Sequence, residues 1–290
     1  MLSRSMGVRV STAFTVGVCL LLAGCDSGSK AGSGQPGSYH VTPFHASDFV
    51  DPRIGSNAWF PLVPGTQWVR EGTTLIGNRV VPHQVITTVT DVIRIIAGAP
   101  TVLVYDHSVG AGQVVQNSID YFAQDKKGNI WDLGGVTEQF EAGRFVAVDE
   151  VWLTGVNGAK PGILMPANPP STPAWVIAQP PGESGDAAAY ARIQPQECVP
   201  FGCYRNVLVI EEGKRSALNN EFKYYVRGAG QIRNEPLGAS RHADIERLIN
   251  LTMLSRQGLA EASAAALQID RQAVKEWPAV FGTVRASRAP

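Results

Sequence analysis

The chain has 290 residues and carries 25 acidic and 25 basic side chains, so its formal net charge is zero. This balance gives no electrostatic reason to expect a nucleic-acid partner, and we expect none. Hydrophobic residues make up 44% of the chain, enough for a sizeable core, and 30 Gly and 19 Pro suit a chain with many turns.

Residues 1–24 have the pattern of a signal peptide. Two arginines precede an apolar run over 10–22, which is too short for a comfortable permanent membrane span. The run ends in the letters LAGC at Cys25, which resemble the bacterial lipoprotein signal. We therefore expect Cys25 to be the lipidated N-terminus of the mature chain, carrying acyl chains such as palmitate that hold it stably on a membrane. The alternative is an ordinary cleaved signal followed by a chance cysteine.

Residues 25–50 begin with a stretch rich in Gly and Ser and are expected to form a flexible tether. The lipid anchor predicts a bacterial cell-envelope location, on the periplasmic or cell-surface side. Asp26 resembles an inner-membrane retention signal of enterobacteria, but the choice between inner and outer membrane stays open.

Two cysteines, Cys198 and Cys203, flank a short turn that contains Pro and Gly. Export places them in an oxidising compartment, so we expect a disulfide that clamps a hairpin. A zinc site is the alternative, but no second Cys or His pair lies nearby in the sequence.

Residues 51–238 predict a mainly β domain: a curved antiparallel sheet or half-barrel meander. Short segments rich in Val, Ile and aromatic residues alternate with polar positions, and Gly, Asn, Asp or Pro separates them. The stretch YFAQDKKGNIWDLGG (121–135) carries closely spaced oxygen ligands and invites a calcium-site interpretation. Lysines occupy the middle of that loop, so we favour a hairpin turn in which Asn could replace Asp125 at little cost.

Residues 239–280 are rich in Ala, Leu, Glu, Arg and Gln and predict two C-terminal helices separated near Gly258. Helical spacing of Ile245, Leu248, Ile249 and Thr252 supports the first of them. Residues 281–290 are expected to be a disordered tail.

Several segments together resemble an uncharacterised family of bacterial exported and lipoprotein domains. The match covers about 57–235, and one departure is Arg70, where the family often has Tyr. The resemblance implies an architecture broadly similar to the half-barrels of periplasmic lipoprotein carriers, and it supplies no catalytic residues. The segments that carry it are WFPLVPGTQWVREG (59–72), YFAQDKKGNIWDLGG (121–135), GVNGAKPGILMPANP (155–169) and KYYVRGAGQI (223–232).

No motif for catalysis, a metal or a cofactor is evident. The letters GESGD around Ser184 fail the G-x-S-x-G pattern of a nucleophile elbow. The run Asp106-His107-Ser108 names the residues of a hydrolase triad, but neighbours on a strand point to opposite faces. We therefore expect no catalytic residue, no metal and no cofactor, and we lean against an enzyme.

Three functional hypotheses remain. The first is a membrane-tethered, non-enzymatic binding or envelope-assembly protein with an apolar small molecule or an envelope protein as its partner. The second is an extracytoplasmic hydrolase with a dispersed site around His107, Asp106 or Asp120, and the third is a purely structural interaction module. For the first hypothesis, the candidate lining of an apolar ligand site is Trp59, Trp68, Tyr121, Trp131, Trp152 and Met165.

Overall fold

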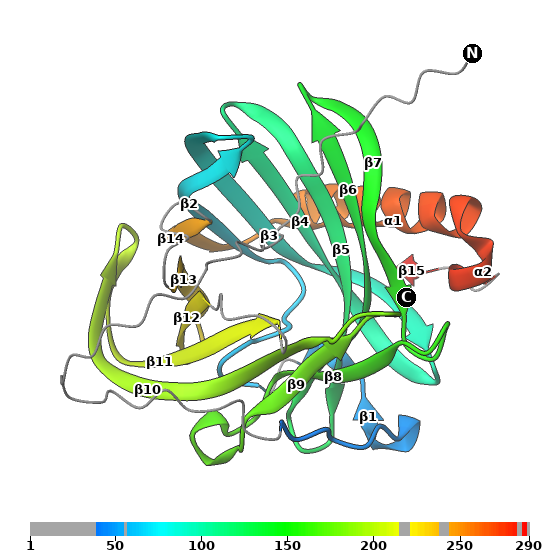
Figure 1. Cartoon of the computed structure of the whole chain (residues 1–290), viewed down its shortest axis with the longest axis horizontal. Helices are drawn as coiled ribbons and strands as arrows, with labels where there is room; N and C mark the ends of the chain where they lie inside the picture. The colour runs from blue at the N-terminus through cyan, green and yellow to red at the C-terminus, as the bar shows by residue number, and fades with distance from the viewer. Residues whose placement is uncertain (1–38, 55–56, 215–220, 238–243, 283–285, 289–290) are drawn as a thin grey trace, which may run out of the picture.

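The computed structural model describes residues 39–54, 57–214, 221–237, 244–282 and 286–288. Cys25 and the predicted signal peptide lie outside these ranges. The described chain is mainly β, with one long helix near the C-terminus (Figure 1). Within these ranges no helix combines the length and the apolar character needed to cross a membrane.

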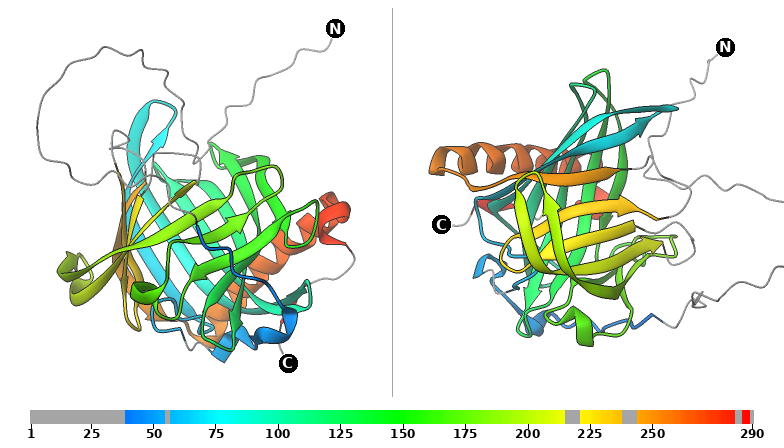
Figure 2. Two further views of the ribbon diagram at one scale, coloured as in Figure 1. Left: turned by 60° about the horizontal axis from the view of Figure 1, so that its bottom comes forward. Right: turned by 90° about the vertical axis from the view of Figure 1, so that its left-hand side faces the viewer.

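The strands form one continuous antiparallel sheet that closes into a twelve-stranded barrel (Figure 2). Around the ring the order is β5-β4-β3-β2-β14-β13-β12-β11-β10-β9-β8-β6, and β6 pairs back with β5. Outside the ring, β1 pairs with β5, β7 pairs with β6, and β15 pairs with β3. The ring strands are β2 (Thr66–Ile76), β3 (Arg79–Ile96), β4 (Ala99–Gly110), β5 (Gln113–Asp125), β6 (Ile130–Glu141), β8 (Lys160–Met165), β9 (Trp175–Gln179), β10 (Asp186–Val199), β11 (Gly202–Lys214), β12 (Glu221–Val226), β13 (Gly230–Pro236) and β14 (Ile245–Met253).

The predicted half-barrel is therefore corrected to a closed barrel. Alternation along each strand is the same in an open sheet and in a closed one, so the sequence pattern could not separate them. Two pairings between distant segments close the ring: β2 with β14, and β6 with β8. Closure satisfies the backbone groups that an open sheet would leave unpaired along its two edge strands.

Residues 245–253 form strand β14 and not the predicted helix. The strand contains a register shift between Leu248 and Asn250, where it pairs with β2. A bulge of this kind adds one residue and breaks the two-residue alternation of a strand. The apolar side chains consequently fall at spacings of three and four residues, which is the spacing that predicted a helix.

The long helix α1 (Arg256–Glu276) lies across the outer side of the barrel (Figures 1 and 2). It contacts β3, β4 and β5, and Ser255 caps its first turn by accepting a hydrogen bond from the backbone N–H of Gly258. A short helix, α2 (Pro278–Phe281), follows it. Strand β15 (Ser287–Arg288) then pairs with β3, so part of the predicted disordered tail joins the sheet.

Part of the predicted tether also packs on the barrel. A 3₁₀ turn, η1 (Ala46–Asp48), leads into β1 (Phe49–Val50), which pairs with β5, and a second turn, η2 (Pro52–Ile54), follows. Phe49 packs edge-on against Trp131, with ring centroids 5.6 Å apart. The remaining elements are β7 (Arg144–Leu153), which extends the sheet beyond β6, and η3 (Pro169–Ser171).

The segment that enters β2 is fixed beside the β5–β6 turn by Asn57. The side-chain amide of Asn57 donates to the backbone carbonyls of Gly128, Met165 and Pro166, at 2.8, 3.2 and 3.3 Å. Its carbonyl oxygen accepts from the backbone N–H groups of Trp59 and Phe60. This buried amide thereby ties the segment to two separate parts of the ring.

The turn between β5 and β6 is a hairpin turn, as predicted. One carboxylate oxygen of Asp125 accepts the backbone N–H groups of Lys127 and Asn129, both at 2.9 Å. The other accepts the Asn129 side-chain amide at 2.7 Å and the Trp131 indole N–H at 2.9 Å. Gly128 supplies the positive φ of 85° that the turn needs. The carboxylate is thus used by the turn itself.

Candidate functional site: a polar and aromatic cavity in the barrel

The barrel holds a partly open cavity of about 180 Å³. One part of its wall is aromatic and apolar, and the other is charged or polar. The apolar part consists of Phe60, Trp68, Val104, Phe122 and Leu164, and the polar part consists of Arg70, Thr87, Asp106, Asp120, Lys223, Tyr225 and Gln231. The cavity is therefore amphipathic and not purely apolar.

The strands bring these side chains inward by their two-residue period. Trp68 and Arg70 lie two residues apart on β2, and Asp120 and Phe122 lie two residues apart on β5. Side chains at such spacing share one face of a strand. An apolar residue and a charged residue thus enter the barrel from the same strand, and the pattern recurs on β4 with Val104 and Asp106.

Arg70 is held by an ion pair inside the barrel wall. Its Nε donates to the carboxylate of Glu246 on β14 at 2.8 Å, and one of its Nη atoms donates to the hydroxyl of Thr87 on β3 at 2.7 Å. Arg70 and Glu246 are both buried. A buried guanidinium needs such compensation, because leaving it unpaired would cost several kcal/mol.

Lys223 is held in the same way on β12, three strands from β2 around the ring. Its ammonium group lies 2.7 Å from a carboxylate oxygen of Glu212 and 3.2 Å from one of Glu221. Burial opposes the charge of Lys223, but these two carboxylates raise its pKa well above the ordinary value. Tyr225 donates its hydroxyl hydrogen to Glu212 at 3.2 Å. Both basic groups of the cavity therefore already have acidic partners.

The two aspartates of the cavity lack such partners. No cation lies within ion-pair distance of Asp106 or Asp120 among the residues that the structure describes, and the Oδ1 atom of Asp106 is buried without a hydrogen bond. Burial raises the pKa of Asp106, although Arg70 and Thr87 oppose the shift. Burial, together with the charge of Asp106 and that of Asp132, raises the pKa of Asp120 well above its ordinary value.

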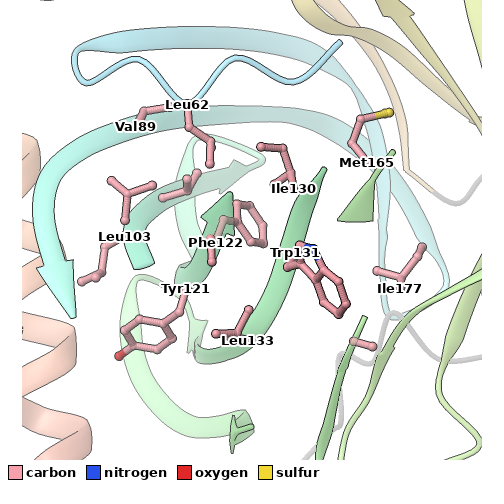
Figure 3. Packing of buried hydrophobic residues seen from close by; sticks show 14 of the residues in the cluster. Leu62, Val89, Leu103, Tyr121, Phe122, Ile130, Trp131, Leu133, Met165 and Ile177 are labelled. Carbon is pink, nitrogen blue, oxygen red and sulfur yellow. The ribbon is translucent and has the colours of Figure 1, made fainter. Parts of the chain in front are cut away.

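The six aromatic and Met residues proposed from the sequence lie in different places. Trp68 lines the cavity. Tyr121 faces the helix on the outer side, where its hydroxyl donates to Asp270 at 2.8 Å, while its neighbour Phe122 faces inward (Figure 3). Trp131 packs on the N-terminal segment outside the ring.

The other three candidates are buried but do not border the cavity. Trp59 is buried, and the guanidinium of Arg227 lies over its ring, with Cζ of Arg227 4.3 Å from the ring centre. Trp152 donates its indole N–H to Glu150 at 2.8 Å. Met165 has no exposed surface and anchors Asn57 through its backbone carbonyl.

Two of the three residues of the hydrolase hypothesis meet at the cavity, and the third does not. Asp106 and Asp120 both face the cavity, but His107 points to the other face of β4, where its Nδ1 lies 2.7 Å from the side-chain oxygen of Asn117. Ser184 lies in an exposed loop before β10. Among the described residues, no three His, Cys, Asp or Glu side chains are grouped so that they could hold a metal ion.

The predicted disulfide is confirmed. Cys198 and Cys203 are joined, and they are direct partners across the β10–β11 hairpin with Cα atoms 4.1 Å apart. Neither cysteine lines the cavity. The disulfide is a clamp on one hairpin.

No protein-family model matches the sequence, and no curated protein matches it. Two solved structures are similar to the chain. One is a protein from Bacteroides fragilis, provisionally classed as exported and described as having a YmcC-like fold; it is 8% identical, covers 68% of this chain and 99% of its own, and gives a TM-score of 0.32. The other, provisionally classed as a lipoprotein from Parabacteroides distasonis, is 12% identical, covers 67% and 97%, and gives a TM-score of 0.29. At these scores the two likenesses carry no argument about function.

Proposed function

We propose that this protein is a lipid-anchored binding protein of the bacterial cell envelope, and that its barrel holds one small molecule with an apolar body and a polar end. The amphipathic cavity is the observation that carries the proposal, because ligand pockets combine a mostly apolar and aromatic lining with a few placed polar groups. The lipoprotein-type signal that ends at Cys25 supports the anchor.

The volume of the cavity limits the size of the ligand. An apolar cavity of roughly 150 Å³ is enough to hold benzene, and this cavity measures about 180 Å³. Drug-sized ligands usually occupy roughly 300–1,000 Å³. We infer a ligand with about one aromatic ring and a short polar substituent. A whole lipid with two acyl chains is too large for the cavity in this conformation.

Binding fits the arrangement better than hydrolysis does. A hydrolase of the serine or cysteine type would need a Ser or Cys nucleophile and a histidine base within hydrogen-bond reach of a substrate in the cavity. His107 faces the other side of its strand, and neither Ser nor Cys lines the cavity. The carboxyl groups of Asp106 and Asp120 are placed to accept hydrogen bonds from a bound molecule.

Saturation-transfer NMR with three single-ring probes tests the proposal. Benzylamine, benzyl alcohol and benzoate share one ring and differ in the charge of the polar end. We expect at least one of them to bind the mature lipidated protein in mild detergent. Leu164→Trp should abolish that binding, because the larger indole would fill the apolar side of the cavity beside Phe122.

Leu75→Trp is the matched control, since Leu75 lies near the tip of the β2–β3 hairpin and its side chain is 39% exposed. This variant adds the same indole to the protein without entering the cavity and should leave probe binding unchanged. The proposed function would be overturned if no probe bound, or if the parent and the Leu164→Trp variant bound every probe equally well.

A further inference from the structure

We infer that the ligand of the cavity is cationic: a small protonated amine whose ammonium group is received by Asp106 and Asp120, with its apolar body against Trp68 and Phe122. This inference rests on the proposed binding function and specifies its ligand class. It depends on the charges that surround the cavity, on the hydrogen bonds those charges already make, and on the aromatic side chains beside them.

Acidic groups outnumber basic groups around the cavity. The basic groups are Arg70 from β2 and Lys223 from β12. Asp106 and Asp120 face them from β4 and β5, Glu246 pairs with Arg70, and Glu212 and Glu221 pair with Lys223. Further carboxyl groups close enough to act on Asp120 belong to Asp132 and Glu150. A positive ligand would stabilise the ionised form of these carboxyl groups, whereas an anion would be repelled by it.

The hydrogen bonds already present exclude the alternative of an anion site. Arg70 gives its Nε to Glu246 and an Nη atom to Thr87, and Lys223 lies between two carboxylates. An incoming carboxylate or phosphate would have to displace these internal partners. By contrast, the buried Oδ1 of Asp106 has no hydrogen-bond partner within the described chain, and Asp106 belongs to the wall of the cavity.

Aromatic side chains lie next to the acidic groups. Phe122 is two residues from Asp120 on β5, and Trp68 is two residues from Arg70 on β2, so all four side chains enter the same space. The faces of aromatic rings attract cations, and this attraction strengthens when water is excluded. An ammonium group with an attached ring would thus find both a carboxyl acceptor and an apolar surface.

The raised pKa values of the two aspartates link the binding of a cation to the release of a proton. In the empty barrel, burial favours the neutral carboxylic acid at Asp106 and at Asp120. An ammonium group favours the ionised carboxylate, so its arrival lowers the carboxyl pKa and a proton leaves to the solvent. Charge is conserved: one cation enters and one proton departs. Arg70, Glu246, Lys223, Asp132 and Glu150 act on the same equilibrium and set its position.

The three single-ring probes test the charge of the ligand directly. At neutral pH benzylamine is a cation, benzyl alcohol is neutral and benzoate is an anion. We expect benzylamine to bind the parent protein at least about tenfold more tightly than benzyl alcohol, as a charge-assisted hydrogen bond would give. Benzoate should bind least. Asp106→Asn and Asp120→Asn should each remove most of the benzylamine advantage and leave benzyl alcohol within about threefold of its parent affinity.

Asp149→Asn is the matched control, because Asp149 is an exposed carboxyl on β7 that does not border the cavity. This variant should bind benzylamine and benzyl alcohol with the same affinities as the parent protein. A second measurement needs no variant: calorimetric titration of the parent with benzylamine, in buffers of different ionisation enthalpy, should show proton release.

The outcomes separate this inference from the proposed function. If benzyl alcohol or benzoate bound at least as tightly as benzylamine, and Leu164→Trp still blocked it, the cavity would be a ligand site for a neutral or anionic molecule and the cationic inference would be wrong. The inference would also fail if folded Asp106→Asn and Asp120→Asn kept the full benzylamine advantage. Loss of all probe binding in the parent would overturn both proposals.

Discussion

Arg94 and Asp270 form a buried ion pair that fastens helix α1 to the outside of the barrel. Nη1 of Arg94 on β3 donates to Oδ1 of Asp270 at 2.6 Å, and neither side chain is more than 2% exposed. The remaining partners complete the network: Tyr121 donates to the same carboxylate at 2.8 Å, and Nη2 of Arg94 donates to the carbonyl of Phe281 at 2.7 Å. Strand, helix and C-terminal segment thus meet at one carboxylate.

Removing that carboxylate should strongly destabilise the folded protein. Asp270→Ala leaves the Arg94 guanidinium buried without its counter-charge, which typically costs about 3–5 kcal/mol of folding free energy. Urea denaturation followed by circular dichroism measures the loss. The control is Arg271→Ala, on the exposed side of the same helix, which should change stability by less than about 0.5 kcal/mol. Equal losses in the two variants would contradict a special role for the pair.

Asp125→Asn should destabilise the β5–β6 hairpin, contrary to the expectation from turn propensity. Each carboxylate oxygen of Asp125 accepts two hydrogen bonds. In Asp125→Asn the NH₂ group would replace one of these oxygens and face two N–H donors that it cannot accept from. We expect a loss of about 1–3 kcal/mol, the cost of unsatisfied buried donors. Thermal melts measure it, with Lys127→Ala in the same turn as the control. A melting temperature that rises with calcium in the parent but not in Asp125→Asn would show instead that the loop binds a metal.

The Cys198–Cys203 disulfide should contribute modestly to stability. The bond closes a short loop, so it removes little conformational entropy from the unfolded chain, and we expect a contribution of roughly 2–3 kcal/mol. Comparison of the parent with a Cys198→Ser, Cys203→Ser double variant in chemical denaturation gives this value. Thiol labelling of the exported, unreduced protein should leave both cysteines unmodified, and full labelling of both would exclude the bond.

The cavity aspartates should make stability depend on pH in a defined direction. Their pKa values are raised in the folded protein, so the folded state holds their protons more tightly than the unfolded state does. The stability that this provides is fully present below the pKa of an unfolded aspartate and is lost as the pH rises through the folded pKa. An Asp106→Asn, Asp120→Asn double variant should therefore gain stability over the parent at neutral pH.

That gain should shrink as the pH is lowered towards the ordinary carboxyl range, because the parent aspartates become neutral there. Denaturation at a series of pH values, with Asp149→Asn as the control, measures the difference. A double variant that is less stable than the parent at neutral pH and equally stable in acid would show the opposite sign, and the aspartates would then be stabilised as carboxylates.

The anchor prediction concerns a residue outside the described ranges. The signal that ends at Cys25 predicts acylation and partition with membranes. Cys25→Ser should abolish acylation, which metabolic labelling with a palmitate analogue detects, and should prevent the usual processing of the signal peptide. The same label on Cys25→Ser protein would place the acyl chain on another residue.

The sequence predicted the β class of the fold and the β5–β6 hairpin correctly, because alternation and turn residues are local signals. Closure of the ring was not predictable in this way, since it depends on pairing between segments far apart in the chain. The same distinction applies to the site. Aromatic residues such as Tyr121 and Trp131 attract attention as ligand contacts, yet they cover the outer face.

Pairs of residues two apart on one strand are a better sequence signal for the site than aromatic residues alone. Trp68 and Arg70, Val104 and Asp106, and Asp120 and Phe122 are pairs two residues apart, each with one apolar and one charged member. A charge that shares a strand face with core residues must lie in the interior, where only a partner or a cavity can accommodate it. Which partner it meets depends on the neighbouring strands and therefore on the complete topology.

The pairing of β2 with β14 also determines when during folding the barrel interior can form. Thr73 pairs with Ile245, near the opposite end of the β region, so this contact closes a very long loop of chain. Contacts of such separation form slowly, because the loop entropy must be lost before the pairing compensates for it. As the chain is synthesised the N-terminal strands emerge first, and until β14 follows they present an unpaired edge to any chaperone or neighbouring chain. The protein is therefore most exposed to misassembly in the interval before β14 pairs with β2.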